Sequence, residues 1–306
     1  MRGEPAAEVD VDEALVRRLL ADQAPHLAHL ALHSPRNGWD NRTWRLGDDL
    51  AVRLPRRAAA AGLLAHEQRW LPTIAPRLPL PVPAPQVVGA PDAGYPWPWS
   101  VVPWYDGDVA ARSAVHPDEA RTLARFLAAL HRPADPQAPV NPFRSVHLAD
   151  RLPGLEQWLA VEHAPEDADL VARAAALVTR AAHEQPRNVG PVQLHGDLHP
   201  RNVLVRDGRL AAVLDWGDLC GGDPATDIAT LWWLFEPTHH DAFWHEYADR
   251  APDPALWHRS RAWAALFGLM FLDFATADGP AVADVEAADL GRAMLRRVLD
   301  EQQPPA

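Results

Sequence analysis

Residues 192–218, VQLHGDLHPRNVLVRDGRLAAVLDWGD, contain most of the information about the fold of this chain. Short apolar runs alternate there with polar side chains at defined intervals. Asp197 follows His195 by two residues, Asn202 follows Asp197 by five, and Asp215 follows Asn202 by thirteen. This spacing places several polar side chains with oxygen or nitrogen atoms in one short segment. Such a concentration is typical of a functional site rather than of a packed core.

A hairpin turn is predicted at Asp207-Gly208, because Asp-Gly between two apolar runs favours positive φ at both central positions. Pairing of the two runs would bring Asn202, which leads into one run, close to Asp215, which follows the other. Amide and carboxylate oxygens that converge in this way suit Mg²⁺, which keeps several waters and accepts phosphate oxygens. Asp197 would then orient a hydroxyl and take its proton. These are the parts of a phosphoryl-transfer site.

The segment His195-Gly-Asp197-Leu-His-Pro-Arg-Asn202, together with Asp215-Trp-Gly, resembles the aminoglycoside phosphotransferase family of protein-kinase-like folds. That family includes antibiotic kinases and small-metabolite kinases such as choline kinases. The resemblance implies an α+β, bilobal protein-kinase-like fold with a small β-rich N-lobe and a larger, mostly helical C-lobe. It also implies that ATP or GTP donates its γ-phosphate to a hydroxyl of a small molecule, with Mg²⁺ as cofactor.

The resemblance assigns a role to each matching residue of the C-lobe. Asp197 would be the catalytic base, and His195 would brace its loop. Asn202 and Asp215 would hold Mg²⁺ in a cleft between the lobes. Asp227 would tie down the backbone of the catalytic loop, although an acid at this position would equally suit a helix N-terminus.

In the N-lobe, Arg53 stands where these kinases have the Lys that contacts the α- and β-phosphates. Arg keeps the charge and can bind two phosphate oxygens, but it is longer and planar, so the chain departs here from the family pattern. Glu67 is the expected ion-pair partner, and an ordinary surface acid is the alternative. Gly38, in the loop SPRNGWDN, would cover the phosphates, and backbone groups of Val102 and Trp104 would contact the base.

The order of elements along the chain agrees with two lobes. In the first hundred residues we predict a hairpin, an Ala-rich helix that ends before Pro72, and a buried strand, over residues 41–55, 57–71 and 99–104. A period of 3.6 residues predicts the later helices, over residues 117–131, 148–162, 166–184, 223–235, 239–249, 254–275 and 281–300. The expected N-lobe, hinge and C-lobe are residues 1–102, 103–107 and 108–306.

Composition narrows the class of protein. The net charge is −12, which disfavours a general nucleic-acid or anionic-membrane binder. The one cysteine, Cys220, allows no internal disulfide and fits a reducing cytoplasm, and we expect it to be a small buried side chain. No stretch is long and apolar enough to predict a transmembrane helix, and the N-terminus lacks the apolar segment of a signal peptide.

The acceptor is expected to bind to the last helices. Residues 218–306 contain 15 acids and 6 arginines, which accounts for most of the negative charge. An acidic wall attracts a polycation, so an aminoglycoside is the first expectation and a macrolide or nucleoside antibiotic the next. Most aromatic residues here are expected in the core, with Phe267, Phe271 and Phe274 on one helix face. The acids expected to contact the acceptor are Asp218, Asp223, Glu236 and Asp273.

Three other classes stay open. A metabolite kinase of the choline-kinase type would bind a cation in an aromatic cleft. A non-catalytic, nucleotide-binding pseudokinase would fit the arginine at position 53, although Asp197, Asn202 and Asp215 are all present. A metal hydrolase would use the histidines and aspartates of the 192–218 segment as ligands, but it leaves Asn202 and the Asp-Trp-Gly segment without a role.

Overall fold

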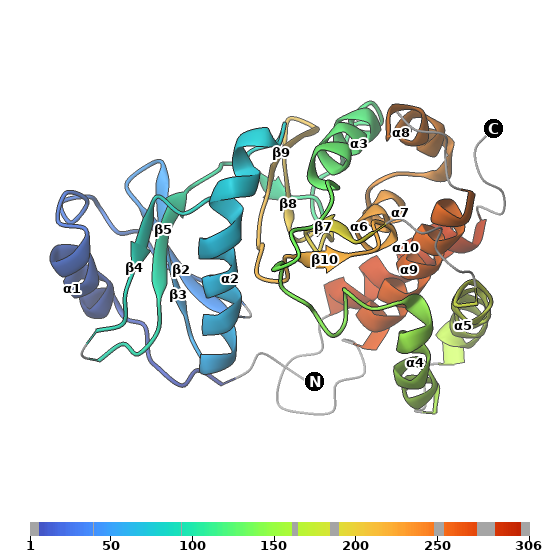
Figure 1. Ribbon diagram of the computed structural model, residues 1–306, viewed down its shortest axis with the longest axis horizontal. Helices are drawn as coiled ribbons and strands as arrows, with labels where there is room; N and C mark the ends of the chain where they lie inside the picture. The colour runs from blue at the N-terminus through green and yellow to red at the C-terminus, as the bar shows by residue number, and fades with distance from the viewer. Residues whose placement is uncertain are drawn as a thin grey trace. The chain divides into compact units, whose positions relative to one another are not determined.

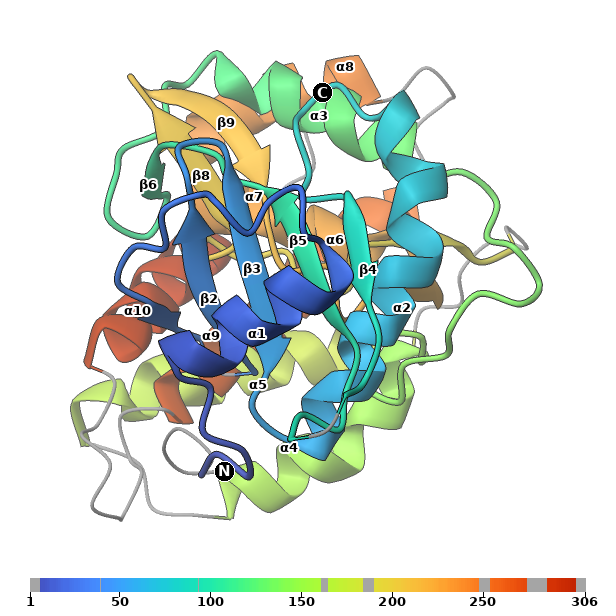
Figure 2. The same ribbon diagram turned by 90° about the vertical axis from the view of Figure 1, so that its left-hand side faces the viewer.

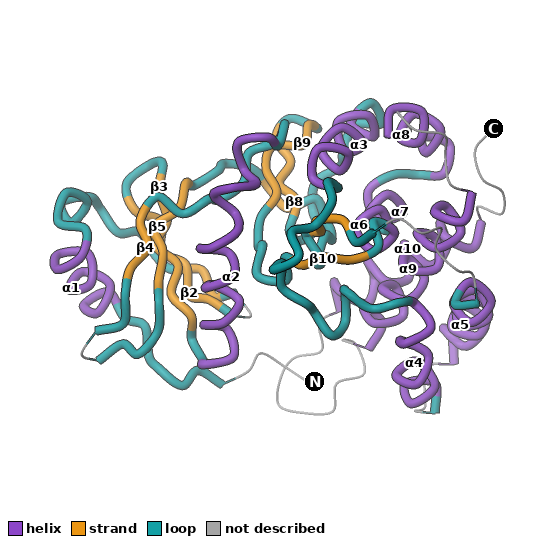
Figure 3. Tube along the Cα trace, in the orientation of Figure 1, coloured by secondary structure: helices purple, strands orange, loops and turns teal. Residues whose placement is uncertain are grey.

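The computed structural model describes residues 6–38, 40–92, 94–160, 165–183, 190–247, 254–273 and 285–300. The chain divides into two compact units. The first consists of Glu4–Gly107 together with Ala211–Gly217, and the second is built mainly from Asp108–Leu210 and Asp218–Ala306. The first unit contains the main β-sheet and the second is mostly helical (Figure 1, Figure 3). This is the expected α+β kinase-like fold.

The first unit contains a five-stranded sheet with strand order β1-β2-β3-β5-β4, in which all neighbours are antiparallel. The predicted hairpin over residues 41–55 is confirmed, and it turns at Gly47, whose φ is +58°. The elements of this unit are α1 (Glu13–Gln23), β1 (Arg36–Asn37), β2 (Asn41–Leu46), β3 (Leu50–Pro55), α2 (Ala58–Ile74), the 3₁₀ turn η1 (Ala75–Arg77), β4 (Val87–Gly89) and β5 (Trp99–Pro103).

The two faces of this sheet carry different helices, since alternate residues of a strand point to opposite sides. Val52 and Leu54 pack with Leu19 of α1 in one apolar cluster, and Figure 2 shows α1 lying across that face. Arg53 and Ser100, on the other face, meet side chains of α2. The polar members of β3 and β5 are therefore directed away from the core.

Helix α2 is longer than predicted, because it continues through Pro72 to Ile74. A proline inside a helix removes one backbone hydrogen bond. Here it lies in the last turn, and Leu71 and Ile74 on either side of it are buried. Packing of these side chains holds the final turn, so tertiary contacts overcome the local preference for ending the helix.

The remaining strands form two small sheets, with strand orders β10-β7 and β6-β8-β9. The elements after Gly107 belong to the second unit, except that β9 continues into the segment Ala211–Gly217 of the first. The predicted two-residue turn is confirmed, because Asp207 and Gly208 have φ of 54° and 76°. The elements are β6 (Asp108–Val109), α3 (Glu119–Leu130), η2 (Leu148–Arg151), α4 (Leu152–Leu159), η3 (Pro165–Asp167), α5 (Ala168–Ala181), β7 (Val192–Leu194), β8 (Val203–Arg206), β9 (Arg209–Val213), β10 (Cys220–Gly222), α6 (Ala225–Ile228), α7 (Thr230–Leu234), η4 (Pro237–His239), α8 (His240–Tyr247), α9 (Pro254–Asp273) and α10 (Val285–Asp300).

The helices of this unit pack around α9, which contacts α5, α6, α7 and α10. The predicted helix over 223–235 is divided into α6 and α7, with Ala229 between them. Parts of the predicted helices, at residues 161–162, 184, 248–249, 274–275 and 281–284, lie outside the described residues. No helix in the described part of the chain has the length and apolar character needed to cross a membrane.

Candidate functional site

Arg53 and Glu67 form the predicted ion pair inside the first unit. Arg53 Nη1 lies 2.5 Å from Glu67 Oε1, and the two side chains are only 10% and 2% exposed. Arg53 Nη2 lies 3.6 Å from Asp215 Oδ1, in the segment Ala211–Gly217 of the same unit. The alternative that Glu67 is an ordinary surface acid is wrong, because the register of β3 directs Arg53 toward α2.

Burial and charge act in opposite directions on this pair. Burial raises the pKa of Glu67, although the adjacent guanidinium opposes that shift. Burial alone would lower the pKa of Arg53, but the charges of Glu67 and Asp215 hold it above its ordinary value. Because a guanidinium does not lose its proton in proteins, the pair presents a fixed positive charge with a buried counter-ion.

Asp215 has a left-handed backbone conformation, with a φ of 57°, and its side chain is 51% exposed. The neighbouring Trp216 is fully buried, and its Nε1 donates to the Val213 carbonyl at 3.0 Å. Gly217 follows where an added Cβ would come within 3.0 Å of Leu63. The Asp-Trp-Gly segment is thus anchored by the tryptophan, and the carboxylate is directed to solvent.

The other predicted nucleotide residues lie on or beside the same sheet. Gly38 is exposed, and its N–H donates to the Asn41 carbonyl at 2.9 Å, which closes a turn between β1 and β2. Val102 is buried in β5 and pairs with Ala51. The Trp104 N–H donates to the Asp49 carbonyl at 2.7 Å. Any role of Trp104 in base recognition therefore does not involve that amide.

In the second unit, the catalytic-loop candidate begins where β7 ends. Pairing of Leu194 with Cys220 brings this loop beside Asp218. Gly196 has a φ of 87°, and an added Cβ there would lie 2.4 Å from the Asp218 carbonyl oxygen. Only glycine fits this position, because both the backbone conformation and the available space exclude a side chain.

Asp227 fixes the backbone of this loop. Its carboxylate accepts hydrogen bonds from the His195 N–H at 2.7 Å and from the Gly196 N–H at 2.9 Å. His131 Nε2 lies 3.3 Å from the same carboxylate, and His131 Nδ1 lies 2.8 Å from the Tyr247 hydroxyl. Burial would raise the pKa of Asp227, but the hydrogen bond and charge of His131, with smaller contributions from the loop, lower it. The prediction that Asp227 ties down the loop is confirmed.

Asp197 stands on this loop with its side chain 28% exposed. His195 braces it, since the Asp197 N–H donates to His195 Nδ1 at 3.2 Å. Asp197 Oδ2 lies 3.3 Å from His199 Nε2, and Asp197 Oδ1 accepts from Arg144 Nη2 at 2.9 Å. Burial would raise the pKa of Asp197, but the charge and hydrogen bond of His199, followed by the charge of Arg144, lower it. The carboxylate is therefore ionised at neutral pH.

Asn202 is oriented by the same loop, because its Nδ2 donates to the Asp197 carbonyl at 2.9 Å. This bond uses the NH₂ group of the amide and leaves Oδ1 as its acceptor atom. An amide oxygen is a suitable Mg²⁺ ligand. The half-exposed carboxylate of Asp215 in the first unit is equally suitable. The two residues therefore fit the implied cation in donor type. Among the described residues no cluster of three or more His, Cys, Asp or Glu side chains has metal-site geometry.

The acids predicted to meet the acceptor are largely occupied by other groups. Arg259 Nε lies 2.6 Å from Asp223 Oδ2, and Arg297 Nη2 lies 2.7 Å from Glu236 Oε1. Asp218 Oδ1 accepts from an asparagine, Asn141, at 2.6 Å. The fourth predicted acid, Asp273, is the last residue of α9 and is partly buried. Two of the four charges are thus neutralised by arginine.

Two aromatic residues that we expected in the core instead lie partly exposed near Asp197. The Phe267 ring centroid is 4.8 Å from Arg144 Cζ. The Phe271 ring centroid is 5.3 Å from that of His199 and 4.5 Å from that of Trp233. The core prediction is wrong for Phe267 and Phe271, because both side chains are only partly buried. Phe274 lies outside the described residues.

Several side chains of this site carry no signal in the sequence. Arg144 and Asn141 come from the segment between α3 and α4, more than fifty residues before Asp197. His131 ends the helical pattern of α3, and Tyr247 is the last residue of α8. Neither occurs at an interval that relates it to the catalytic loop. Only the packing of α3 against α8 brings them to Asp227.

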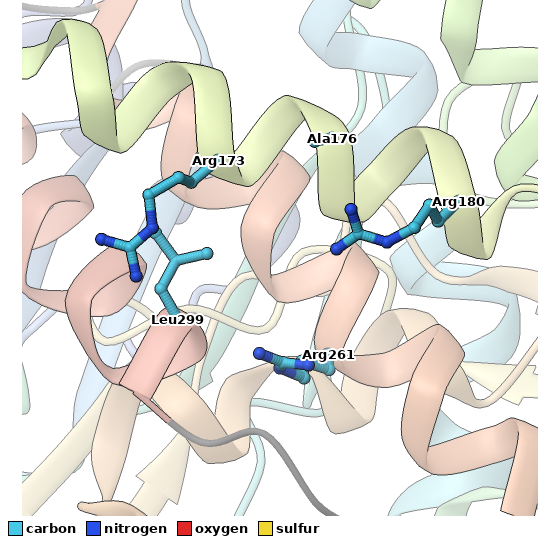
Figure 4. A pocket seen from close by; sticks show the side chains of 5 residues that line it. All are labelled: Arg173, Ala176, Arg180, Arg261 and Leu299. Carbon is cyan, nitrogen blue, oxygen red and sulfur yellow. The ribbon is translucent and has the colours of Figure 1, made fainter.

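A separate surface cavity of about 390 Å³ lies between α5, α9 and α10, and none of the predicted site residues lines it (Figure 4). Arg173 is paired there with Asp169 at 3.3 Å. Arg261 Nε donates to the Val298 carbonyl at 2.8 Å, in the last turn of α10, and thereby satisfies one of the carbonyls that a helix end leaves unpaired. The cavity is lined by Arg173, Ala176, Arg180, Arg261 and Leu299.

Comparison with known proteins supports the kinase-like fold. The structure is similar to the GDP complex of aminoglycoside 2'-phosphotransferase-IIIa, with a TM-score of 0.68, 17% identity, and coverage of 95% of this chain and 99% of that one. It is also similar to macrolide 2'-phosphotransferase MphH from Brachybacterium faecium, with a TM-score of 0.59, 24% identity, and coverage of 90% and 97%.

A further similar structure is macrolide 2'-phosphotransferase type I, with a TM-score of 0.61, 22% identity, and coverage of 95% and 99%. No curated protein sequence is significantly similar to the chain. The model of the phosphotransferase enzyme family matches residues 31–263, which is more than half of the chain. With the fold and the catalytic-loop geometry described above, this match shows that the chain belongs to the phosphotransferase enzyme family.

Proposed function

We propose that the protein is a small-molecule O-phosphotransferase that moves the γ-phosphate of ATP or GTP to a hydroxyl group. One observation carries the proposal. Asp197, an ionised and partly exposed carboxylate, stands on a loop whose backbone is held by the buried Asp227. Such a carboxylate is suited to orient a hydroxyl at neutral pH.

The reaction needs little covalent participation by the protein. The acceptor hydroxyl donates a hydrogen bond to Asp197, and its oxygen attacks the γ-phosphorus. The new P–O bond forms while the bond between the γ-phosphorus and the bridging oxygen breaks, and the nucleoside diphosphate leaves. The acceptor proton passes to Asp197.

Other residues supply charge and position. Arg53, held by Glu67, would bind the α- and β-phosphates. Asn202 and Asp215 would hold Mg²⁺, which neutralises phosphate charge when bound. His195 and Asp227 keep the loop in place. The presence of the whole set favours a catalytic protein over a pseudokinase.

An antibiotic is the first candidate for the acceptor, because similar structures are of aminoglycoside and macrolide phosphotransferases. The local charge, however, gives little support to an aminoglycoside, since Asp223 and Glu236 are paired with arginines. A metabolite kinase is the second candidate. The choline-kinase type would bind a cationic acceptor against aromatic side chains, and Phe267 and Phe271 of α9 are partly exposed.

The test is a coupled assay of nucleoside diphosphate release with ATP and with GTP, over a panel of aminoglycosides, macrolides, nucleoside antibiotics, amino alcohols and sugar acids. A true acceptor gains about 80 Da, the mass of one phosphoryl group, in mass spectrometry. Turnover should require a divalent cation. Asp197→Asn should lower product formation by about 10²–10⁴-fold, while Asp118→Asn, which changes an exposed acid, should leave it unchanged. Unchanged turnover in the Asp197 variant would contradict the proposal.

A further inference from the structure

The cavity between α5, α9 and α10 is lined by three arginines. Arg173 and Arg180 both belong to α5, and their spacing in the sequence places them about two helical turns apart on one face. Arg261 reaches the same cavity from α9. Figure 4 shows the two arginines of α5 on the side of that helix that faces Arg261 and Leu299. Guanidinium groups from two helices therefore line one space of about 390 Å³.

Arg180 has the most capacity to bind a ligand. It is exposed, and no described residue forms an ion pair or hydrogen bond with its side chain. Arg173 is paired with Asp169, but both side chains are more than half exposed, and such a pair contributes little to stability. Arg261 donates from Nε to the Val298 carbonyl at 2.8 Å, which orients its guanidinium. A ligand in the cavity can therefore reach charged donors without breaking a strong interaction of the protein.

The arrangement of these donors suits a phosphate group better than a carboxylate. A guanidinium presents five N–H donors in a planar fork. A phosphomonoester carries about 1.5 to 2 negative charges at pH 7 and three strong acceptor oxygens. Because those oxygens are arranged tetrahedrally, guanidinium groups can bind them from several directions at once. A carboxylate has two oxygens in one plane, so fewer of the three arginines can bind it.

The size and lining of the cavity restrict the ligand further. Its volume lies in the range of about 300–1,000 Å³ that is usual for small-molecule sites, which exceeds the need of a bare phosphate ion. Ala176, between the two arginines of α5, and Leu299 of α10 supply apolar surface. The net charge of the whole chain is −12, and this charge repels a long polyanion outside the cavity. A small organic phosphate fits all three features.

From these observations we propose that the cavity between α5, α9 and α10 binds a small phosphomonoester. Its phosphate group lies between the arginines, and its organic part packs against Leu299 and Ala176. Arg180 supplies the largest share of the binding, because its donors have no other described partner. The site is separate from the proposed phosphotransferase site, since none of the residues assigned to that function lines the cavity. Binding at this site can therefore be measured without turnover.

The experiment compares compounds that share a phenyl ring and differ in their charged group. Phenyl phosphate, phenyl sulfate and benzoate form this set, and inorganic phosphate has the anion without the ring. Each compound is titrated into the full chain by calorimetry, in the absence of nucleotide and divalent cations. The variants are Arg180→Gln, Arg180→Lys and Arg173→Gln. Arg121→Gln is the control, because it changes an exposed arginine of α3 outside the cavity.

We expect phenyl phosphate to bind more tightly than the other three compounds. Arg180→Gln should raise its Kd about tenfold, the lower end of the range for a hydrogen bond to a charged group, because Arg180 is exposed to solvent. Arg180→Lys keeps the charge and should restore part of the loss. Arg173→Gln should raise the Kd by less than about fivefold, since Asp169 competes for that arginine. Arg121→Gln should leave the Kd unchanged.

Several results would overturn the inference. Equal affinity for benzoate and phenyl phosphate would indicate general attraction of anions, and a Kd that Arg180→Gln leaves unchanged would place the binding elsewhere, such as at the proposed nucleotide site. No binding of phenyl phosphate, or tighter binding of inorganic phosphate or of a short single-stranded DNA, would also overturn it. The proposed function fails separately, if the wild-type protein transfers no phosphate, and the titration with phenyl phosphate still decides the inference in that case.

Discussion

Substitution of Asp227 by asparagine should loosen the attachment of the loop around Asp197 to α6. Oδ1 of this carboxylate accepts from the Gly196 N–H, and Oδ2 accepts from the His195 N–H and contacts His131. An asparagine has one oxygen and one NH₂ group. Its least costly placement keeps the oxygen at the Oδ2 position and turns the NH₂ group toward the Gly196 N–H. One buried backbone donor then loses its acceptor.

The expected cost is about 1.5–3 kcal/mol of unfolding free energy, the value of one hydrogen bond to a charged group. The loop loses a constraint next to Asp197, and displacement of a reacting group by about 1 Å can reduce the rate by about 100-fold. We therefore expect kcat to fall by a factor of about 10 to 100. Urea denaturation followed by tryptophan fluorescence measures the first effect, and the coupled assay measures the second.

The effect on stability should depend on pH in a defined direction. The folded pKa of Asp227 lies below its ordinary value, while an unfolded aspartate titrates near about 3.9. The unfolded chain therefore binds the proton more tightly, and the contribution of Asp227 is complete above about pH 5 and declines as the pH falls through the folded pKa. The difference between wild type and Asp227→Asn should be constant near neutral pH and shrink below about pH 4.

Asp169→Asn is the matched control, since Asp169 is 83% exposed and pairs with an exposed arginine. Such pairs contribute under about 1 kcal/mol. An Asp227→Asn protein whose stability lies within about 0.5 kcal/mol of wild type, with unchanged kcat, would refute the view that this carboxylate holds the loop.

Three further predictions concern other residues. Asp197→Asn should lower kcat by about 10²–10⁴-fold and leave nucleotide binding by calorimetry within twofold or so; weaker nucleotide binding in step with kcat would argue against its role as base. Glu67→Gln removes the buried counter-ion of Arg53 and should cost about 2–4 kcal/mol, with a higher KM for the nucleotide only; a change confined to the acceptor KM would contradict this. Cys220 is buried and burial raises the pKa of its thiol to about 12, so an aromatic disulfide reagent at pH 8 should label it only after unfolding.

The kinase-like fold was predicted from the resemblance of the segments around Asp197, Asn202 and Asp215 to a known family. A short loop, a two-residue turn and a strand separate Asp197, Asn202 and Asp215 along the chain. The turn at Asp207-Gly208 has the expected φ angles. The ion pair of Arg53 and Glu67 was predicted from the family pattern and is present. Cys220 is a buried side chain, as its lone occurrence suggested.

Acceptor recognition could not be predicted in the same way. The count of acids after residue 218 indicated an attractive wall for a polycation, but a count contains no information about pairing. Asp223 and Glu236 are each bonded to an arginine from a different helix. The helical period placed Phe267 and Phe271 on one face, but it did not show that both side chains stay partly exposed.

The sequence by itself therefore indicated the family and the candidate residues of the loop around Asp197, because these residues occur within one short segment of the chain. Only the tertiary structure decided which groups surround Asp197. Arg144 lies 53 residues before it and Asp227 lies more than thirty residues from the loop backbone that it holds. Contacts over such separations form when helices and strands pack, and no periodicity in the chain records them.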